Sequence, residues 1–157
     1  MNELHRRAVV ADTHNDLLDA VSMRSPDHWS AFFRSQWYPQ LRDGGVGIQV
    51  LPVFIDEPFL PEGALRRTLT MIEAGHRVAE GNVDVVGLCL DGADVDRVLQ
   101  SGRIALVLAL EGMPGLDGDV AMLETMYRLG IRIGSLAHFG RGAFADGSGE
   151  DATGGGA

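Results

Sequence analysis

The chain has a single cysteine, Cys89, among 157 residues, so it can form no internal disulfide and no cysteine-rich zinc site. The simplest interpretation of Cys89 is a small buried apolar residue. Basic residues are also few, since 13 Lys and Arg stand against 22 Asp and Glu and the formal net charge is −9. This acidity argues against binding to nucleic acid or to anionic membranes. It is compatible with cation binding or with a soluble enzyme.

Long apolar runs and targeting signals are missing as well. No stretch approaches the roughly 18 apolar residues that a membrane helix needs. The first seven residues are polar, and the apolar run behind them is too short for a signal peptide, so we expect a cytoplasmic protein with no membrane partner. With 45% hydrophobic residues the chain can bury a core, and its length suits a single domain over residues 1–157.

Apolar runs and helical patterns alternate along the chain. The runs typical of buried strands cover residues 8–11, 46–54, 104–110 and 131–137. A helical stripe lies between the second and third runs and consists of Leu65, Leu69, Ile72, His76 and Ala79. Shorter helices can begin at Asp91 or Asp94 and at Asp117 or Asp119, and Gly102 and Gly130 can close them. This alternation predicts an α/β fold with a parallel sheet or barrel.

Metal-binding residue types follow three of these strands. His14 and Asp16 come after the first run, Glu111 directly after the third, and His138 at the end of the fourth. In parallel α/β folds the carboxyl ends of the strands meet at one edge, where the chemistry gathers. An imidazole and a carboxylate two residues apart on a strand share a face and begin a zinc site.

Each of these residues also has a simpler interpretation. His14 can be a hydrogen-bonded core histidine, and Asp16 can cap the helix that follows it. Glu111 can cap the glycine-containing turn behind it, and His138 can bond a neighbouring loop. Asp12, on the same strand face as His14, either orients the imidazole ring or binds backbone amides.

Two segments favour loops. Five of the ten aromatic residues follow the first strand closely, at Trp29, Phe32, Phe33, Trp37 and Tyr38. We interpret this segment as a loop that either walls a substrate pocket or forms its own hydrophobic cluster. Residues 140–157 contain seven glycines among 18 residues and predict a loop or tail.

Three motifs taken together resemble the N-terminal part of the renal or membrane dipeptidase family, zinc peptidases of the M19 type. They are residues 10–17 (VADTHNDL), 109–112 (ALEG) and 129–138 (LGIRIGSLAH). The resemblance extends from about Val9 to the terminal loop. It implies a (β/α)8 barrel of the TIM-barrel type, of which the chain supplies about the first four strand–helix units.

The resemblance also implies residue roles. His14 and Asp16 would bind the first of two zinc ions, Glu111 would bridge both ions as the catalytic carboxylate, and His138 would contact the substrate. The implied reaction is hydrolysis of a dipeptide by a metal-bound hydroxide. The family takes the histidines of its second zinc from later strands, and no histidine follows His138 here, so the second site lacks those ligands. We therefore expect impaired activity from this chain.

Two alternatives remain open at this stage. One is a non-catalytic half barrel that acts only by association with a complementary C-terminal half or with itself, because an open sheet exposes strand edges and apolar surface. The other is a different metal-dependent barrel hydrolase of the amidohydrolase or metallophosphatase sort. Amidohydrolases usually begin with His-x-His, whereas Asp16 occupies the second position here.

Overall fold

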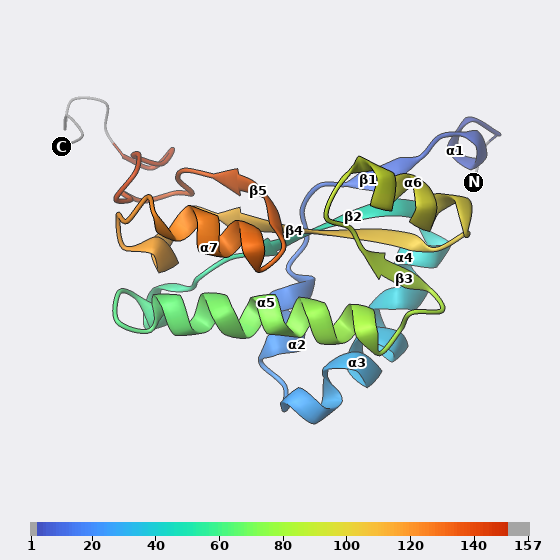
Figure 1. The fold of residues 1–157 in the computed structure, drawn as a ribbon, viewed down its shortest axis with the longest axis horizontal. Helices are drawn as coiled ribbons and strands as arrows, with labels where there is room; N and C mark the ends of the chain where they lie inside the picture. The colour runs from blue at the N-terminus through green and yellow to red at the C-terminus, as the bar shows by residue number, and fades with distance from the viewer. Residues whose placement is uncertain (1–2, 151–157) are drawn as a thin grey trace.

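A curved parallel sheet with helices packed on it forms the centre of the molecule (Figure 1). The computed structural model describes residues 3–150. Its strands are β1 (Val10–Asp12), β2 (Val46–Val53), β3 (Val86–Leu88), β4 (Ile104–Glu111) and β5 (Ile131–Ser135). All four strand pairings are parallel, which confirms the predicted α/β fold with a parallel sheet.

Strand β4 is the most extensively paired strand of the sheet. The order along the sheet is β1–β2–β4–β3, and β5 also pairs with β4. Strand β2 occupies one side of β4, so β3 and β5 share the other side. There β3 pairs with residues 104–106 of β4 and β5 with residues 108–111.

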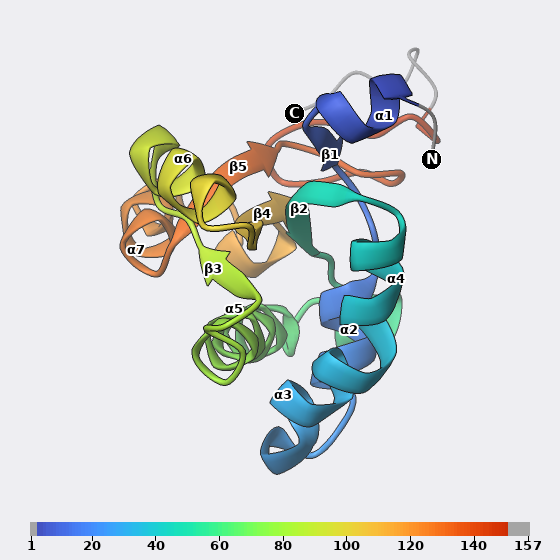
Figure 2. The same ribbon diagram turned by 90° about the vertical axis from the view of Figure 1, so that its right-hand side faces the viewer.

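Helices lie on both faces of this sheet. They are α1 (Glu3–Arg7), α2 (Leu17–Ser22), α3 (Trp29–Phe32), α4 (Tyr38–Asp43), α5 (Ala64–Glu80), α6 (Gly92–Gln100) and α7 (Met122–Arg128), with short 3₁₀ turns at Pro26–His28, Glu57–Phe59 and Pro114–Leu116 and a π turn at Phe33–Trp37. Figure 2 looks along the long helix α5: α5 and α2 lie below the sheet, α4 lies to the right of β2, and α6 lies at the upper left.

The main hydrophobic core lies between the sheet and α5. Alternate residues of β4 point into it, because successive side chains of a strand face opposite sides: Ile104, Leu106, Leu108 and Leu110. The α5 backbone comes close to the sheet at Gly75, where a Cβ atom would stand 2.8 Å from a methyl group of Leu108. Burial of these side chains is the principal source of stability.

A smaller core lies on the opposite face, at the amino ends of the strands. There α6 packs Val98 against Cys89 and Ala105. A Cβ atom on Gly87 of β3 would come within 2.6 Å of Val98, so the missing side chain permits this contact. Toward the carboxyl ends of the strands this face is open, and Ile133 of β5 and Leu136 just beyond it are exposed.

Several expectations about local structure need correction. The fourth predicted strand ends at Ser135 rather than at residue 137, and β3 was not expected. The aromatic segment is helical instead of a loop, with Trp29 and Phe33 buried in the main core and Phe32, Trp37 and Tyr38 packed against it. In α5 the predicted stripe is displaced, since Leu65 and Leu69 are exposed while Ala64, Thr68 and Gly75 are buried.

Other local predictions are confirmed. The Asp91 carboxylate accepts the backbone N–H of Asp94 and caps α6. Gly102 and Gly130 have φ angles of +73° and +104° just beyond α6 and α7, a conformation that glycine adopts without strain. His76 packs inward, and its Nε2 bonds to the carbonyl of Leu129 at 2.8 Å.

The glycine-rich stretch predicted over residues 140–157 is described as far as Glu150. Up to that point it forms turns and an isolated antiparallel bridge between Arg141 and Asp146. Residues 151–157 lie outside the described part of the chain. Within residues 3–150, no helix is long and apolar enough to cross a membrane.

Candidate functional site

Four predicted residues meet at the carboxyl edge of the sheet. His14 and Asp16 lie in the turn between β1 and α2, Glu111 is the last residue of β4, and His138 follows the end of β5. Because all the strands run in parallel, their carboxyl ends share this edge. We call His14, Asp16, Glu111 and His138 the strand-end cluster.

Glu111 lies at the centre of the strand-end cluster. Its Oε1 is 3.3 Å from Nε2 of His138, and its Oε2 is 3.7 Å from Nδ1 of His14. On the far side of the His14 ring, Nε2 is 3.8 Å from Oδ1 of Asp16. The Glu111 side chain is only 17% exposed, whereas that of Asp16 is 80% exposed. A poorly solvated carboxylate therefore has an imidazole beside each of its two oxygens.

The donor types of the strand-end cluster are those of a zinc site. Zinc accepts imidazole nitrogens and carboxylate oxygens, and two donors about 2 Å from one ion at tetrahedral angles stand roughly 3.3 Å apart. However, Asp16 and Glu111 face different nitrogens of the His14 ring. Within residues 3–150, no three His, Cys, Asp or Glu side chains stand close enough together to hold a metal ion as they are. The residues fit zinc in their chemistry, and His14 stands 3.7 and 3.8 Å from the two carboxylates, wider than the spacing of ligands on one ion.

The structure tests the simpler interpretations of Asp16 and Glu111. Asp16 occupies the N-cap position of α2, but its side chain makes no capping hydrogen bond there. The Asn15 side chain accepts the backbone N–H of Leu17 instead, at 3.0 Å. Glu111 faces two histidines rather than the amides of the turn behind it. Neither carboxylate has the helix-capping or turn-capping contact considered from the sequence.

For Asp12, the contacts select one of the two alternatives. Its Oδ1 accepts the backbone N–H of His14 at 3.1 Å, and its Oδ2 accepts the side-chain amide of Asn15 at 3.2 Å. The carboxylate thus holds the backbone of the turn, not the imidazole ring.

A glycine after β4 lets the ends of β4 and β5 approach each other. Gly112 has a φ of +79°, and a Cβ atom there would lie 3.4 Å from the backbone nitrogen of His138. Its N–H donates to the carbonyl and to the hydroxyl of Ser135, at 3.1 and 3.2 Å. This short turn brings His138 up to Glu111.

Sequence reasoning missed Phe54, which follows the end of β2. Its ring meets the His138 ring edge-on, with centroids 4.8 Å apart and planes at 64°. Such a contact fixes the orientation of an imidazole. The available signal was that position 54 closes an apolar run ending at the same edge as Glu111.

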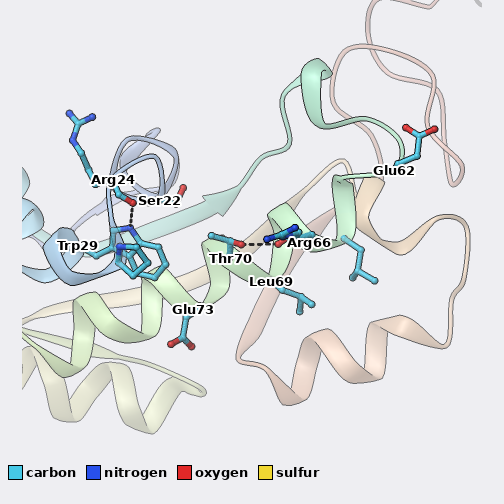
Figure 3. A pocket seen from close by; sticks show the side chains of 10 residues that line it. Ser22, Arg24, Trp29, Glu62, Arg66, Leu69, Thr70 and Glu73 are labelled. Atoms are coloured by element: carbon cyan, nitrogen blue, oxygen red, sulfur yellow. Dashed lines mark hydrogen bonds between the residues drawn. The ribbon is translucent and has the colours of Figure 1, made fainter.

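A separate groove lies away from the strand-end cluster. It measures about 740 Å³ and runs between α2, α3 and the outer side of α5, where Trp29, Leu65 and Leu69 supply apolar surface (Figure 3). No member of the strand-end cluster lines it. The displaced stripe of α5 explains this groove, because Leu65 and Leu69 face it rather than the core.

The lone thiol takes no part in the cluster. Cys89 is buried beside Val98, and its burial raises the pKa of the thiol above the usual value. A neutral, buried thiol is a poor nucleophile and a poor metal ligand. This agrees with the interpretation of Cys89 as a small apolar residue.

Comparison with known proteins identifies the family to which this architecture corresponds. The family model described as membrane dipeptidase (peptidase family M19) matches residues 1–155. The dipeptidase ataJ of Aspergillus terreus is 32% identical over 117 residues, which cover 68% of this chain and 28% of that protein.

Solved structures share the fold. The dipeptidase AC of family M19 superposes with a TM-score of 0.75 at 18% identity, covering 85% of this chain and 45% of that one. A metallopeptidase of Rhodobacter sphaeroides was solved with a phosphinate mimic of the dipeptide L-Ala-D-Ala. It superposes with a TM-score of 0.75 at 16% identity, and the match covers 86% of this chain and 48% of that one. The predicted TIM-barrel type is confirmed, and the chain spans less than half the length of these relatives.

Proposed function

Since the chain belongs to the membrane dipeptidase family, peptidase family M19, we propose that its strand-end cluster serves metal-dependent hydrolysis of dipeptides. The observation that carries this proposal is the position of Glu111, with His14 at one carboxylate oxygen and His138 at the other. An ordinary core carboxylate would be paired with a cation or with backbone amides.

In this proposal His14, Asp16 and Glu111 hold zinc. When bound, the ion supplies a lowered pKa for water and polarisation of the scissile carbonyl. Glu111 has its two oxygens turned toward different neighbours, which suits a carboxylate that bridges two ions. Its low exposure strengthens every charge interaction it makes, because little water screens it.

His138 is assigned to the substrate. Its side chain is half exposed, and its Nε2 lies beside Glu111, so it can donate a hydrogen bond to the oxygen of a carbonyl bound at that point. The Phe54 ring packs edge-on against the His138 ring and supports it from the side.

The substrate class follows from the relatives. The Rhodobacter sphaeroides structure was solved with a mimic of L-Ala-D-Ala, and we propose that the present site accepts small dipeptides of this kind, D-residues at the C-terminal side included. The chain covers 45–48% of the length of the solved relatives, and hydrolysis of dipeptides is what we propose for the protein as a whole. We propose that residues 1–157 alone hydrolyse dipeptides weakly, because no further histidine supplies a second zinc.

The test is a zinc titration of the 157-residue chain and of three variants. We expect His14→Ala and Glu111→Gln to lower zinc affinity by more than the roughly 10-fold to 100-fold that loss of a residue orienting a ligand costs, because each removes a proposed ligand itself. Glu124→Gln is the matched control, because Glu124 lies exposed on α7 and pairs with Arg128 on the same helix. Zinc binding that is equal in all four proteins would contradict the assignment. Hydrolysis of Gly-D-Phe by the zinc-loaded chain, compared with a complete relative, measures the expected impairment.

A second candidate function rests on a different observation. Ile133, Leu136 and Phe139 are exposed beside β5, near the strand-end cluster. Such apolar surface is typical of a region that another chain segment covers. We propose as the alternative that the chain associates with a complementary half barrel or with itself and has no catalysis of its own. Gel filtration over a range of concentrations tests the self-association, because a chain that stays monomeric at every concentration excludes it. Zinc-dependent activity of the chain would exclude the absence of catalysis.

A further inference from the structure

We propose that Asp12, Asn15 and Gln49 form a positioning device, which we call the turn brace, and that it holds His14 and Asp16 where a metal ion can be bound. This inference rests on the proposed function, because it concerns the same site. None of the three residues is itself assigned to the ion.

The first part of the turn brace is the Asp12 carboxylate. Asp12 ends β1, and its two oxygens accept the backbone N–H of His14 and the side-chain amide of Asn15, at 3.1 and 3.2 Å. These bonds fix the first two peptide units beyond the strand. They therefore decide the direction in which the His14 side chain leaves the backbone.

The second part connects the turn to the helix behind it. The Asn15 side-chain oxygen accepts the N–H of Leu17, the first residue of α2, at 3.0 Å. Leu17 and Leu18 are fully buried in the main core, so this helix is a rigid anchor. One asparagine side chain thus links Asp12 on one side of Asp16 to Leu17 on the other.

The third part reaches the turn from the neighbouring strand. Gln49 of β2 is fully buried, and its side-chain nitrogen donates to the carbonyl of Asp12 at 3.3 Å and to that of Val50 at 2.8 Å. Its Oε1 is buried without a hydrogen-bond partner among the described residues. An unpaired buried oxygen costs stability. A role in holding the end of β1 accounts for a glutamine where a leucine would pack at lower cost.

The exposure of the proposed ligands explains the need for such a device. Asp16 is 80% exposed, and its side chain makes no helix cap. Surrounding side chains therefore do little to fix its position. The backbone must be held instead, and the turn brace does this from two strands and one helix.

The pair Asp12 and Asn15 permits a charge-neutral exchange as the test. In Asp12→Asn two amide groups face each other, and in Asn15→Asp two carboxylates do, so each single variant loses the side-chain bond. In the double variant the amide at position 12 donates to the carboxylate at position 15, which still accepts the N–H of Leu17. Zinc affinity of the full 157-residue chain is measured by competition with a chromogenic chelator. Amide hydrogen exchange of His14 and Leu17 is measured without metal.

We expect each single variant to lose roughly 10-fold to 100-fold in zinc affinity, the range found for residues that orient metal ligands. We expect the double variant to recover most of that loss. Amide protection of His14 and Leu17 should fall and recover in parallel. A role that is merely structural would lower the melting temperature without this pattern in zinc affinity.

The outcomes separate the two proposals. Single variants that bind zinc as tightly as the wild type, or a double variant that fails to recover, overturn the turn brace and leave the proposed function intact. A wild-type chain that binds no zinc overturns the proposed function, and the amide protection then decides alone whether the turn brace holds the turn.

Gln49→Met examines the third part. Methionine has nearly the same length, removes the unpaired oxygen and loses the bond to Asp12. We expect unchanged or increased thermal stability together with weaker zinc binding. Weaker binding with intact stability supports the positioning role, and unchanged zinc affinity removes Gln49 from the turn brace.

Discussion

The two faces of β4 and β5 differ sharply in how completely they are covered. On the face toward α5, Leu108 is 0% exposed and belongs to the main core. On the opposite face, β5 presents Ile133 with 48% of its surface exposed. The first face is closed by helices of this chain, whereas the second is closed only at the amino ends of the strands, by α6. Stability and chemistry therefore depend on different parts of the same strands.

The strand-end cluster lies at the edge where these two environments meet. Glu111 follows seven apolar residues of β4, so its backbone is held by the core while its carboxylate faces the two histidines. This separation means that substitutions in the core and at the edge should affect different measurements.

The largest effect is expected at Leu108. Leu108→Ala removes a fully buried side chain against α5 and should cost about 3–5 kcal/mol of unfolding free energy. Ile133→Ala is the matched control on the open face, and about 1 kcal/mol or less is expected because half of that side chain is exposed. Urea unfolding of both variants measures the difference. Equal losses would mean that the second face is covered in solution.

His138→Ala tests the edge without replacing a proposed metal ligand. We expect roughly tenfold weaker binding of a phosphinate dipeptide mimic, about 1.4 kcal/mol, since one charge-assisted hydrogen bond is lost. Zinc affinity should change by less than about twofold. Calorimetry of the zinc-loaded chain measures both, with His28→Ala as the control histidine. A large loss of zinc affinity would instead make His138 a metal ligand.

Gly112→Ala tests the turn that joins the two strand ends. The φ of +79° is unfavourable for alanine by roughly 1 kcal/mol, and the new Cβ would stand 3.4 Å from His138. We expect a destabilisation of about 1–2 kcal/mol, together with changed NMR signals of the His138 ring. Gly140→Ala is the control, because nothing lies within 4 Å of a Cβ atom there. An unaffected His138 ring would contradict the positioning role of Gly112.

The smallest effect is expected at the start of α6, far from the site. The backbone N–H of Leu90, and next the side chain of Arg97, hold the pKa of Asp94 below its usual value. A lowered pKa in the folded state adds stability above the unfolded pKa of about 3.9, and this stability is lost as the pH falls through the lower folded pKa. Asp94→Asn should therefore be less stable than the wild type at neutral pH and equal to it in strong acid. Unfolding measured from pH 7 to pH 2 tests this, with Asp96→Asn as the control.

Much of the fold could be predicted because β2, β4 and β5 coincide with apolar runs between helical patterns. Strand β3 was missed because Val86-Gly87-Leu88 is too short to show a period. The stripe on α5 was displaced for a different reason. Its buried face includes Gly75, which lets the helix approach Leu108 closely, and Ala64 and Thr68, which lie against Gly115. A search for large apolar residues finds Leu65 and Leu69 instead.

The members of the strand-end cluster could be named from sequence because each follows a strand of the same direction. The side-chain orientations could not. That Asp16 and Glu111 face different nitrogens of His14 depends on the rotation of one ring, which no spacing encodes. Phe54 was missed because an aromatic residue at the end of an apolar run carries no chemical signal until its neighbour across the sheet is known.

The pairing of β4 has a consequence for how the protein opens. Strands β3 and β5 share one side of β4, but each bonds to a separate half of it. Separation of β5 from β4 would release Ser135 and His138 as one unit while β3 and α6 stayed in place. Slow-exchange measurements should therefore find two protection classes along a single strand, with residues 104–106 and 108–111 exchanging through independent openings.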